Sequence, residues 1–238
     1  MAVMINEAMI FSAGLGTRML PLTRTTPKPL IKINKKSILV NNIEKLLKAG
    51  FRNIVINAFY FPNKIHEEVK SFYPKVKVIE ENERLETGGG LLNAMKKNFF
   101  KKKAPIVLIN GDVFWINKEH QTLDKMRNLW DSKKMDILLC LQKKKELCGY
   151  QGNGDFDLSN SNKGIGRVLL RKNPEFVFTG LQIINPVIMK SIRKKVFSTK
   201  ELIFSSINEE KVFGYIDNNP WYHIGTINDL ENCRKIFE

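Results

Sequence analysis

Short apolar runs alternate with longer amphipathic stretches through the first half of the chain. Residues 8–11, 54–56, 76–79 and 106–109 are runs dominated by apolar and β-branched side chains, and each is typical of a buried strand. Apolar side chains recur at helical spacing over residues 39–47, which predicts an amphipathic helix between the first two strands. Alternating strands and helices favour an α/β fold with a mostly parallel sheet that is covered on both faces.

The second half has a more mixed pattern. Strands are predicted at 136–141, 167–171, 176–184 and 212–216, whereas the Gly-, Asn- and Ser-rich stretch 151–163 predicts turns and loop. Ser198 has the spacing of a helix cap, and Thr226 is expected to cap a last helix that buries Leu230, Cys233, Ile236 and Phe237. Because no Pro-rich linker or internal repeat interrupts the pattern, we expect residues 1–238 to form one domain.

The net charge changes this picture little. The 238 residues include 39 Lys and Arg against 24 Asp and Glu, a formal charge of +15, which raises the question of nucleic-acid binding. The basic runs are rich in Lys and lie scattered beside apolar stretches, as solvated surfaces usually do. We therefore expect no nucleic-acid partner, although the positive field would concentrate anionic small molecules such as nucleotides.

Other compositional features also exclude several classes of protein. The three cysteines, Cys140, Cys148 and Cys233, form no CxxC pair, which argues against a disulfide framework or a zinc site. No apolar run approaches the roughly 18 residues of a membrane span, and the opening apolar segment is too short for a signal peptide. We expect a cytoplasmic protein with no membrane partner, and the sequence leaves its oligomeric state open.

The segment after the first predicted strand carries the candidate chemistry. Gly14-Leu15-Gly16-Thr17-Arg18 is followed by Pro27-Lys28-Pro29, and this arrangement matches neither the dinucleotide-binding fingerprint nor the P-loop. Glycines allow successive backbone N–H groups to turn inward around phosphate oxygens. Arg18 can grip two such oxygens through its planar guanidinium, and Lys28 presents a point charge between two prolines. These residues predict a triphosphate cradle.

The same segment resembles the signature of sugar-1-phosphate nucleotidyltransferases, and in particular the N-acetylmuramate 1-phosphate uridylyltransferase group. The resemblance continues through Leu85–Gly90, Asn110–Val113, Phe178–Gly180 and Trp221–Thr226, and so covers most of the chain. It implies a Rossmann-like three-layer αβα sandwich with a mostly parallel mixed sheet. The longer family members carry a C-terminal β-helix of hexapeptide repeats, which the pattern here does not contain.

The resemblance also implies a reaction and a set of residues for it. An NTP and a sugar 1-phosphate would give an NDP-sugar and pyrophosphate, with Mg²⁺, or alternatively Mn²⁺, as the cofactor. Arg18, Lys28 and Asp112 would be catalytic, with Asp112 also the metal ligand. The expected nucleotide-binding residues are Ala13, Gly14, Gly16, Thr17, Glu81, Gly88 and Asn110, and the expected sugar-phosphate residues are Thr179, Gly180 and His223.

One position departs from the family pattern. The late motif usually reads W-x-D-[IV]-G-T, with an aspartate that binds metal, but here it reads Trp221-Tyr222-His223-Ile224-Gly225-Thr226. A neutral imidazole is a poor ligand for Mg²⁺. Three interpretations of His223 follow: contact with a phosphate, ligation of a softer metal, or a structural role.

Several functions remain open at this stage. We expect UTP and N-acetylmuramate 1-phosphate as substrates, in peptidoglycan recycling. A mannose-1-phosphate guanylyltransferase, or another NDP-sugar pyrophosphorylase, is the alternative. A nucleotide-binding regulator without turnover is the alternative from another class, and it rests on the histidine at position 223.

Overall fold

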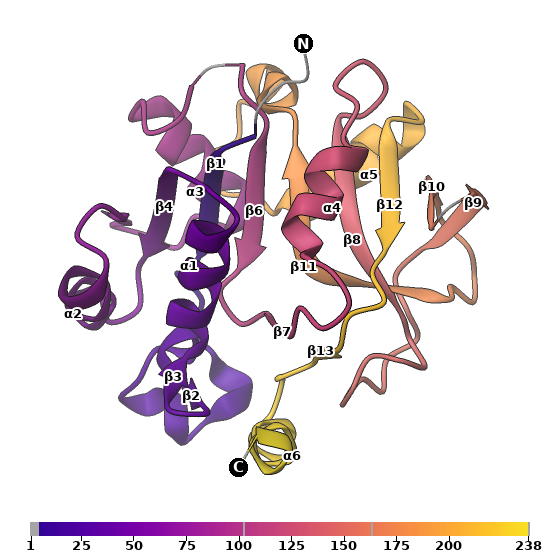
Figure 1. The fold of residues 1–238 in the computed structure, drawn as a ribbon. Helices are drawn as coiled ribbons and strands as arrows, with labels where there is room; N and C mark the ends of the chain where they lie inside the picture. The colour runs from indigo at the N-terminus through magenta and orange to yellow at the C-terminus, as the bar shows by residue number, and fades with distance from the viewer. Residues whose placement is uncertain (1–4, 102, 163, 238) are drawn as a thin grey trace.

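A nine-stranded sheet forms the centre of the protein in the computed structural model (Figure 1), which describes residues 5–101, 103–162 and 164–237. The opening Met1 to Met4 and Lys163, the last residue of the predicted loop, lie outside the described residues. From one edge of the sheet to the other, the strands are β5 (Lys77–Glu80), β4 (Asn53–Ala58), β1 (Glu7–Phe11), β6 (Ile106–Asn110), β11 (Phe176–Ile184), β8 (Ile137–Lys143), β12 (Val212–Ile216), β10 (Ile165–Leu169) and β9 (Asp157–Asn162).

The strand directions explain the hydrophobic pattern. β1 pairs in parallel with β4 on one side and β6 on the other, and all five of its residues are buried. β11 and β10 run against the other strands of this sheet. Strands buried on both faces read as continuous apolar runs, which is why they could be recognised from the sequence.

Helices cover both faces of this sheet. On one face, α1 (Ile38–Lys48), α2 (Pro62–Phe72) and α4 (Thr122–Leu129) bury apolar side chains in one cluster with the strands. On the other face, α3 (Glu86–Lys96) and α5 (Thr199–Asn208) pack into a second cluster. The expected α/β fold, a Rossmann-like three-layer arrangement around a mixed sheet, is confirmed.

Smaller elements close one end of the molecule, below the sheet in Figure 1. β7 (Phe114–Trp115) pairs with β13 (Trp221–Tyr222), and Trp115 stacks on Trp221 with 4.8 Å between ring centroids. The hairpin of β2 (Lys32–Ile33) and β3 (Lys36–Ser37) shares a third apolar cluster with α6 (Ile227–Phe237). This packing brings the end of the chain beside the segments that follow β1 and β6. The described residues also contain the short 3₁₀ helices η1 (Thr17–Met19), η2 (Leu22–Arg24), η3 (Lys28–Leu30) and η4 (Pro186–Ser191).

Two predictions from the sequence were wrong. The stretch 151–163 was expected to be loop, but Asp157–Asn162 forms β9, an edge strand that pairs with β10. Ile236 was expected to be buried, but it is 53% exposed because it lies off the stripe through which α6 packs, where Leu230 and Cys233 are buried. The predicted helix caps are confirmed: Ser198 Oγ accepts from Lys200 N, and Thr226 Oγ1 accepts from Asp229 N.

Candidate active site

The glycine-rich segment leaves β1 and turns at once into η1. Gly16 has a φ of +65°, in the left-handed region, and a Cβ at this position would lie 2.9 Å from Thr23 Cγ2. Thr23 Oγ1 donates to the Gly16 carbonyl at 2.9 Å, so the turn is held by a buried side chain. Glycine is therefore required here both for its backbone angle and for the close approach of Thr23.

Lys28 and Asp112 meet although 84 residues separate them. Lys28 Nζ donates to Asp112 Oδ2 at 2.6 Å; the lysine side chain is 9% exposed and the aspartate side chain 38%. The sheet explains the meeting, because β1 and β6 are parallel neighbours whose last residues, Phe11 and Asn110, are paired. Gly111 N donates to the Phe11 carbonyl at 2.8 Å, which holds the two strand ends together.

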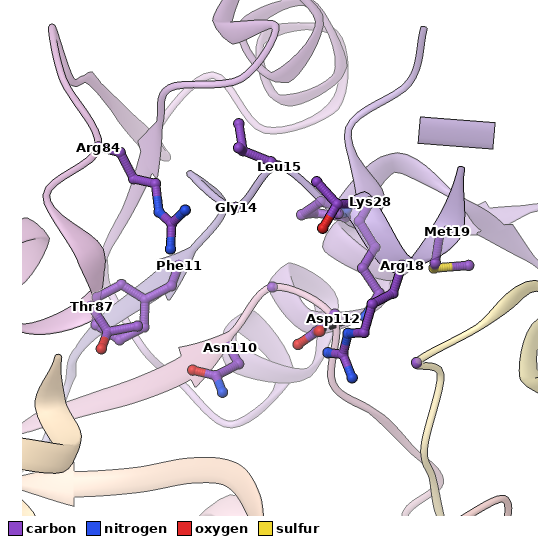
Figure 2. A pocket seen from close by; sticks show the side chains of 15 residues that line it. Phe11, Gly14, Leu15, Arg18, Met19, Lys28, Arg84, Thr87, Asn110 and Asp112 are labelled. Carbon is purple, nitrogen blue, oxygen red and sulfur yellow. Dashed lines mark hydrogen bonds and ion pairs between the residues drawn. The ribbon is translucent and has the colours of Figure 1, made fainter. Parts of the chain in front are cut away.

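A pocket of about 350 Å³ opens beyond these strand ends. Figure 2 shows Arg18, Lys28 and Asp112 on one side of it, Arg84 and Thr87 on the other, and Gly14 and Leu15 between them. The lining comprises Phe11, Gly14–Met19, Lys28, Pro29, Arg84, Thr87, Asn110–Asp112 and Gly225. The predicted cradle residues Gly14, Gly16, Thr17 and Arg18 thus surround one cavity with Lys28 and Asp112.

A second pocket of about 200 Å³ adjoins the first, and Arg18, Asn110 and Asp112 line both. Its other lining residues include Thr179, Gly180 and His223, the three that were expected beside the sugar phosphate. Gly180 has a φ of +88° where the pairing of β11 with β8 shifts register, so this glycine marks a bulge in a strand that also faces a pocket. Thr179 Oγ1 donates to the Cys140 carbonyl at 3.0 Å.

His223 lies between β13 and α6 and lines the second pocket. Its backbone N donates to the Cys148 carbonyl at 2.9 Å, and its ring meets Tyr150 edge-on with 5.8 Å between centroids. Burial lowers the pKa of His223 below its usual 6.5; the nearby cations Lys28 and Arg18 lower it further, against the opposing effect of Asp229 and Asp112. The imidazole is therefore neutral at pH 7 and can offer one N–H donor.

Comparison with known proteins gives this arrangement a context. The sequence profile described as "Nucleotidyl transferase" matches residues 7–151, more than half of the chain. An N-acetylmuramate alpha-1-phosphate uridylyltransferase of Caulobacter vibrioides is 30% identical over 227 residues, which cover 92% of this chain and 91% of that protein. The chain belongs to the nucleotidyl transferase family.

Two further comparisons give a related sequence and a shared fold. The catalytic subunit beta of a mannose-1-phosphate guanylyltransferase of Drosophila pseudoobscura pseudoobscura is 28% identical over 94% of this chain, which spans 60% of that protein. A crystal structure of UDP-glucose pyrophosphorylase with UDP-glucose has the same fold, with a TM-score of 0.79, 16% identity and 98% of both chains covered. The resemblance to sugar-1-phosphate nucleotidyltransferases inferred from the motifs is confirmed.

The remaining sequence-predicted residues, Ala13, Glu81 and Gly88, do not line the first pocket. Glu81 is buried and accepts from Asn57 Nδ2 at 2.8 Å and from Leu85 N at 3.5 Å; burial raises the pKa of this carboxyl group. Gly88 N donates to the Phe197 carbonyl at 2.9 Å, and a Cβ on Gly88 would lie 2.3 Å from the Phe197 ring. Ala13 is also buried.

Arg84 and Thr87 also line this pocket with polar side chains, and sequence reasoning did not single them out as site residues. Thr87 Oγ1 accepts from Thr199 N at 2.9 Å, so it also ties the start of α3 to the start of α5. The sequence offered one signal for them, because Thr87 lies within the Leu85–Gly90 motif and Arg84 directly precedes it. From this region, however, Glu81 and Gly88 were chosen as the nucleotide-binding residues.

The donor set around Asp112 suits a hard cation only in part. Among the described residues, no three His, Cys, Asp or Glu side chains cluster closely enough to hold a metal ion. Asp112 is a half-exposed carboxylate at the junction of both pockets. Mg²⁺ typically takes one or two carboxylates and completes its shell with phosphate oxygens and water, so Asp112 fits a cation that arrives with a nucleotide.

Across the described ranges, which omit Lys102 and Lys163, no helix combines the length and the apolar character that a membrane span requires.

Proposed function

We propose that this protein transfers a nucleotidyl group from an NTP to a sugar 1-phosphate, releasing pyrophosphate. The observation that carries the proposal is the meeting of two pockets at Arg18, Asn110 and Asp112, with the Lys28 ammonium bound to Asp112. The glycine turn lines the larger pocket and suits a triphosphate, whereas Thr179 and Gly180 line the smaller one. Two ligands in these pockets would bring their phosphates together at the shared residues.

The chemistry requires little from the protein beyond position and charge. An oxygen of the sugar phosphate attacks the α-phosphorus, the bond from that phosphorus to the bridging oxygen breaks, and the electron pair leaves with pyrophosphate. The attacking oxygen is already anionic near pH 7, so no general base is needed. Arg18 and Lys28 would neutralise the phosphates, and the backbone N–H groups near Gly14 and Gly16 would orient them.

Asp112 would hold the divalent cation that we propose as cofactor, Mg²⁺ or alternatively Mn²⁺. Such a cation supplies further neutralisation of phosphate charge when it is bound. The ion pair with Lys28 keeps the carboxylate at the junction of the pockets. His223, which is neutral and lines the second pocket, would donate a hydrogen bond to the sugar phosphate and leave the cation to Asp112.

We further propose UTP and N-acetylmuramate 1-phosphate as the substrates, a step of peptidoglycan recycling in the cytoplasm. The support is the uridylyltransferase relative, which is 30% identical over nearly its whole length. Mannose 1-phosphate with GTP is the alternative, because a guanylyltransferase subunit matches 94% of this chain at 28% identity. The three free cysteines are compatible with a reducing compartment.

A substrate panel tests this function. The protein is incubated with Mg²⁺, each of the four NTPs and a set of sugar 1-phosphates, and pyrophosphate release is measured. Release with UTP and N-acetylmuramate 1-phosphate is expected, whereas release with GTP and mannose 1-phosphate alone would move the assignment to the alternative. A protein that binds NTP but releases no pyrophosphate with any acceptor or divalent cation would be a regulator.

Two variants connect this activity to the site. Arg18→Ala and Lys28→Met should each lower kcat by about 10²- to 10³-fold, because they remove a charge that stabilises the transition state. Met is chosen at position 28 because its length preserves the packing of a nearly buried side chain. Lys48→Ala, at the exposed end of α1, is the matched control and should leave turnover unchanged.

A further inference from the structure

The two sides of the larger pocket differ in charge. On one side, Arg18 and Lys28 face the glycine turn, and Asp112 is the carboxylate that compensates them (Figure 2). On the other side lies the segment 81–87, which contains three glutamates and one arginine. A triphosphate is therefore stabilised at the first side, and the uncharged end of a nucleotide is left for the second.

Arg84 is the charged residue of this second side that lines the pocket. Its side chain is 56% exposed, and its guanidinium points into the cavity in Figure 2. Glu86 pairs with it at 3.6 Å, and Glu83 is paired with Lys195. Because the charge of Arg84 is balanced by a neighbour, its N–H groups suit a neutral acceptor better than a phosphate that carries several charges.

The surroundings of Arg84 also suit a flat, partly apolar group. Phe11 and Leu15 line the same pocket, and Thr87 lies beside Arg84 on the same side. The segment is anchored from behind, because buried Glu81 accepts from the backbone N of Leu85, the residue after Arg84. A nucleobase could occupy this end while its edge meets the guanidinium.

We propose that Arg84 reads the edge of the nucleobase and selects bases that carry an exocyclic carbonyl where cytosine and adenine carry an amino group. This inference rests on the proposed function, and it makes Arg84 a specificity residue for the nucleotide. A guanidinium has N–H donors and no acceptor. It therefore pairs with O4 of uracil or O6 of guanine, whereas the amino group of cytosine or adenine would oppose it donor to donor.

The test is equilibrium binding, because it does not depend on turnover. Dissociation constants of UTP, CTP, GTP and ATP are measured by calorimetry for the wild-type protein, Arg84→Ala and Arg84→Gln, with inorganic tripolyphosphate as the probe of the phosphate end. Wild type should prefer UTP to CTP, or GTP to ATP, by at least about tenfold. In Arg84→Ala, the ratio of the dissociation constants of CTP and UTP, or of ATP and GTP, should fall close to one. The affinity for tripolyphosphate should stay within about twofold of the wild-type value.

The controls separate this inference from its alternatives. Arg52→Ala removes an exposed arginine that lines neither pocket and should leave every ratio unchanged. Equal binding of carbonyl and amino bases by wild type, or an unchanged ratio in Arg84→Ala, would overturn the proposal. If Arg84→Ala weakened the binding of tripolyphosphate and of all four NTPs by the same factor, the proposal would also be overturned, and Arg84 would be a phosphate contact. Nucleotide binding without pyrophosphate release would reject the proposed function alone.

Discussion

Asp217 anchors the segment that carries His223, and replacing it is a demanding test of how the site is held in place. Asp217 follows β12 and is fully buried. Its carboxylate accepts from His120 Nε2 at 2.7 Å, from Thr122 Oγ1 at 2.8 Å and from Trp221 Nε1 at 2.8 Å. Trp221 also lines the second pocket, two residues before His223. We predict that Asp217→Ala lowers both stability and affinity for the sugar phosphate.

The magnitude follows from the donors that lose their acceptor. A buried donor without a partner costs about 1–3 kcal/mol, and bonds to a charged group lie at the upper end of the range. Trp221 Nε1 is left unpaired, whereas Thr122 Oγ1 remains within reach of Asn117 Oδ1 at 3.2 Å. Because three donors lose the same carboxylate and one of them keeps another acceptor, the summed cost is about 3–5 kcal/mol. For a chain of this size, we expect the Tm to fall by about 6–20 °C.

Thermal melts followed by far-UV circular dichroism would measure this change without relying on the fluorescence of the affected tryptophan. Asp124→Ala is the matched control, because Asp124 is 46% exposed and paired with Arg127 on the surface of α4. Its removal should cost less than about 1 kcal/mol. In kinetic assays, Asp217→Ala should raise the KM for the sugar phosphate more than the KM for the NTP. A Tm loss below about 3 °C would refute the network as an anchor.

Three further predictions concern single residues. Burial lowers the pKa of Lys45 to about 8, so its charge destabilises the folded protein at pH 7. Lys45→Met removes this charge but also the contact of the ammonium with the Trp115 ring. The net effect should be a rise of about 1–2 kcal/mol in the unfolding free energy at pH 7. This gain should shrink as the pH of thermal melts rises from 8 to 10.5, because folded wild type then loses the charge that burial disfavours. Gly180→Ala should cost about 1–3 kcal/mol in denaturant unfolding, since φ is +88° and the new Cβ would lie 2.8 Å from Asn110 Nδ2. His223→Ala should raise the KM for the sugar phosphate about tenfold and leave NTP binding within about twofold; equal effects on both substrates would contradict a contact with the sugar phosphate.

The strands that could be predicted best from the sequence are those that are buried on both faces of the sheet. The bounds predicted for β11 and β12 agree with the structure, because strands inside the sheet present continuous apolar runs. β9 lies at the edge, pairs with β10 alone and contains Asp157 and Ser159. Its composition is that of a turn, so hydrophobic periodicity could not reveal it.

The residues that we propose for the phosphate end could be selected from the sequence for a related reason. Gly16 and Lys28 belong to a local motif whose residue types are needed for phosphate binding, so the sequence alone indicates them. Arg84 has no such local signature. Its position in the pocket depends on the chain turn before α3, where Glu86 adopts a φ of +61°, and on the packing of α3 against Phe197. Those contacts join segments that are distant in the sequence, and the spacing of hydrophobic residues along the chain does not reveal such contacts.

The two pockets lie at the place where the strand direction changes, because β6 has a parallel neighbour on one side and an antiparallel neighbour on the other. β1 and β6 are parallel, so the glycine turn and Asp112 emerge at the same edge of the sheet. β11 runs antiparallel to β6, and its bulge places Thr179 and Gly180 on the other side of the β6 end. Ligands in open α/β sheets bind where the strand order changes. An in-line transfer needs the entering and leaving oxygens on opposite sides of the phosphorus, and pockets on either side of Asn110 to Asp112 can provide that arrangement without movement of the sheet.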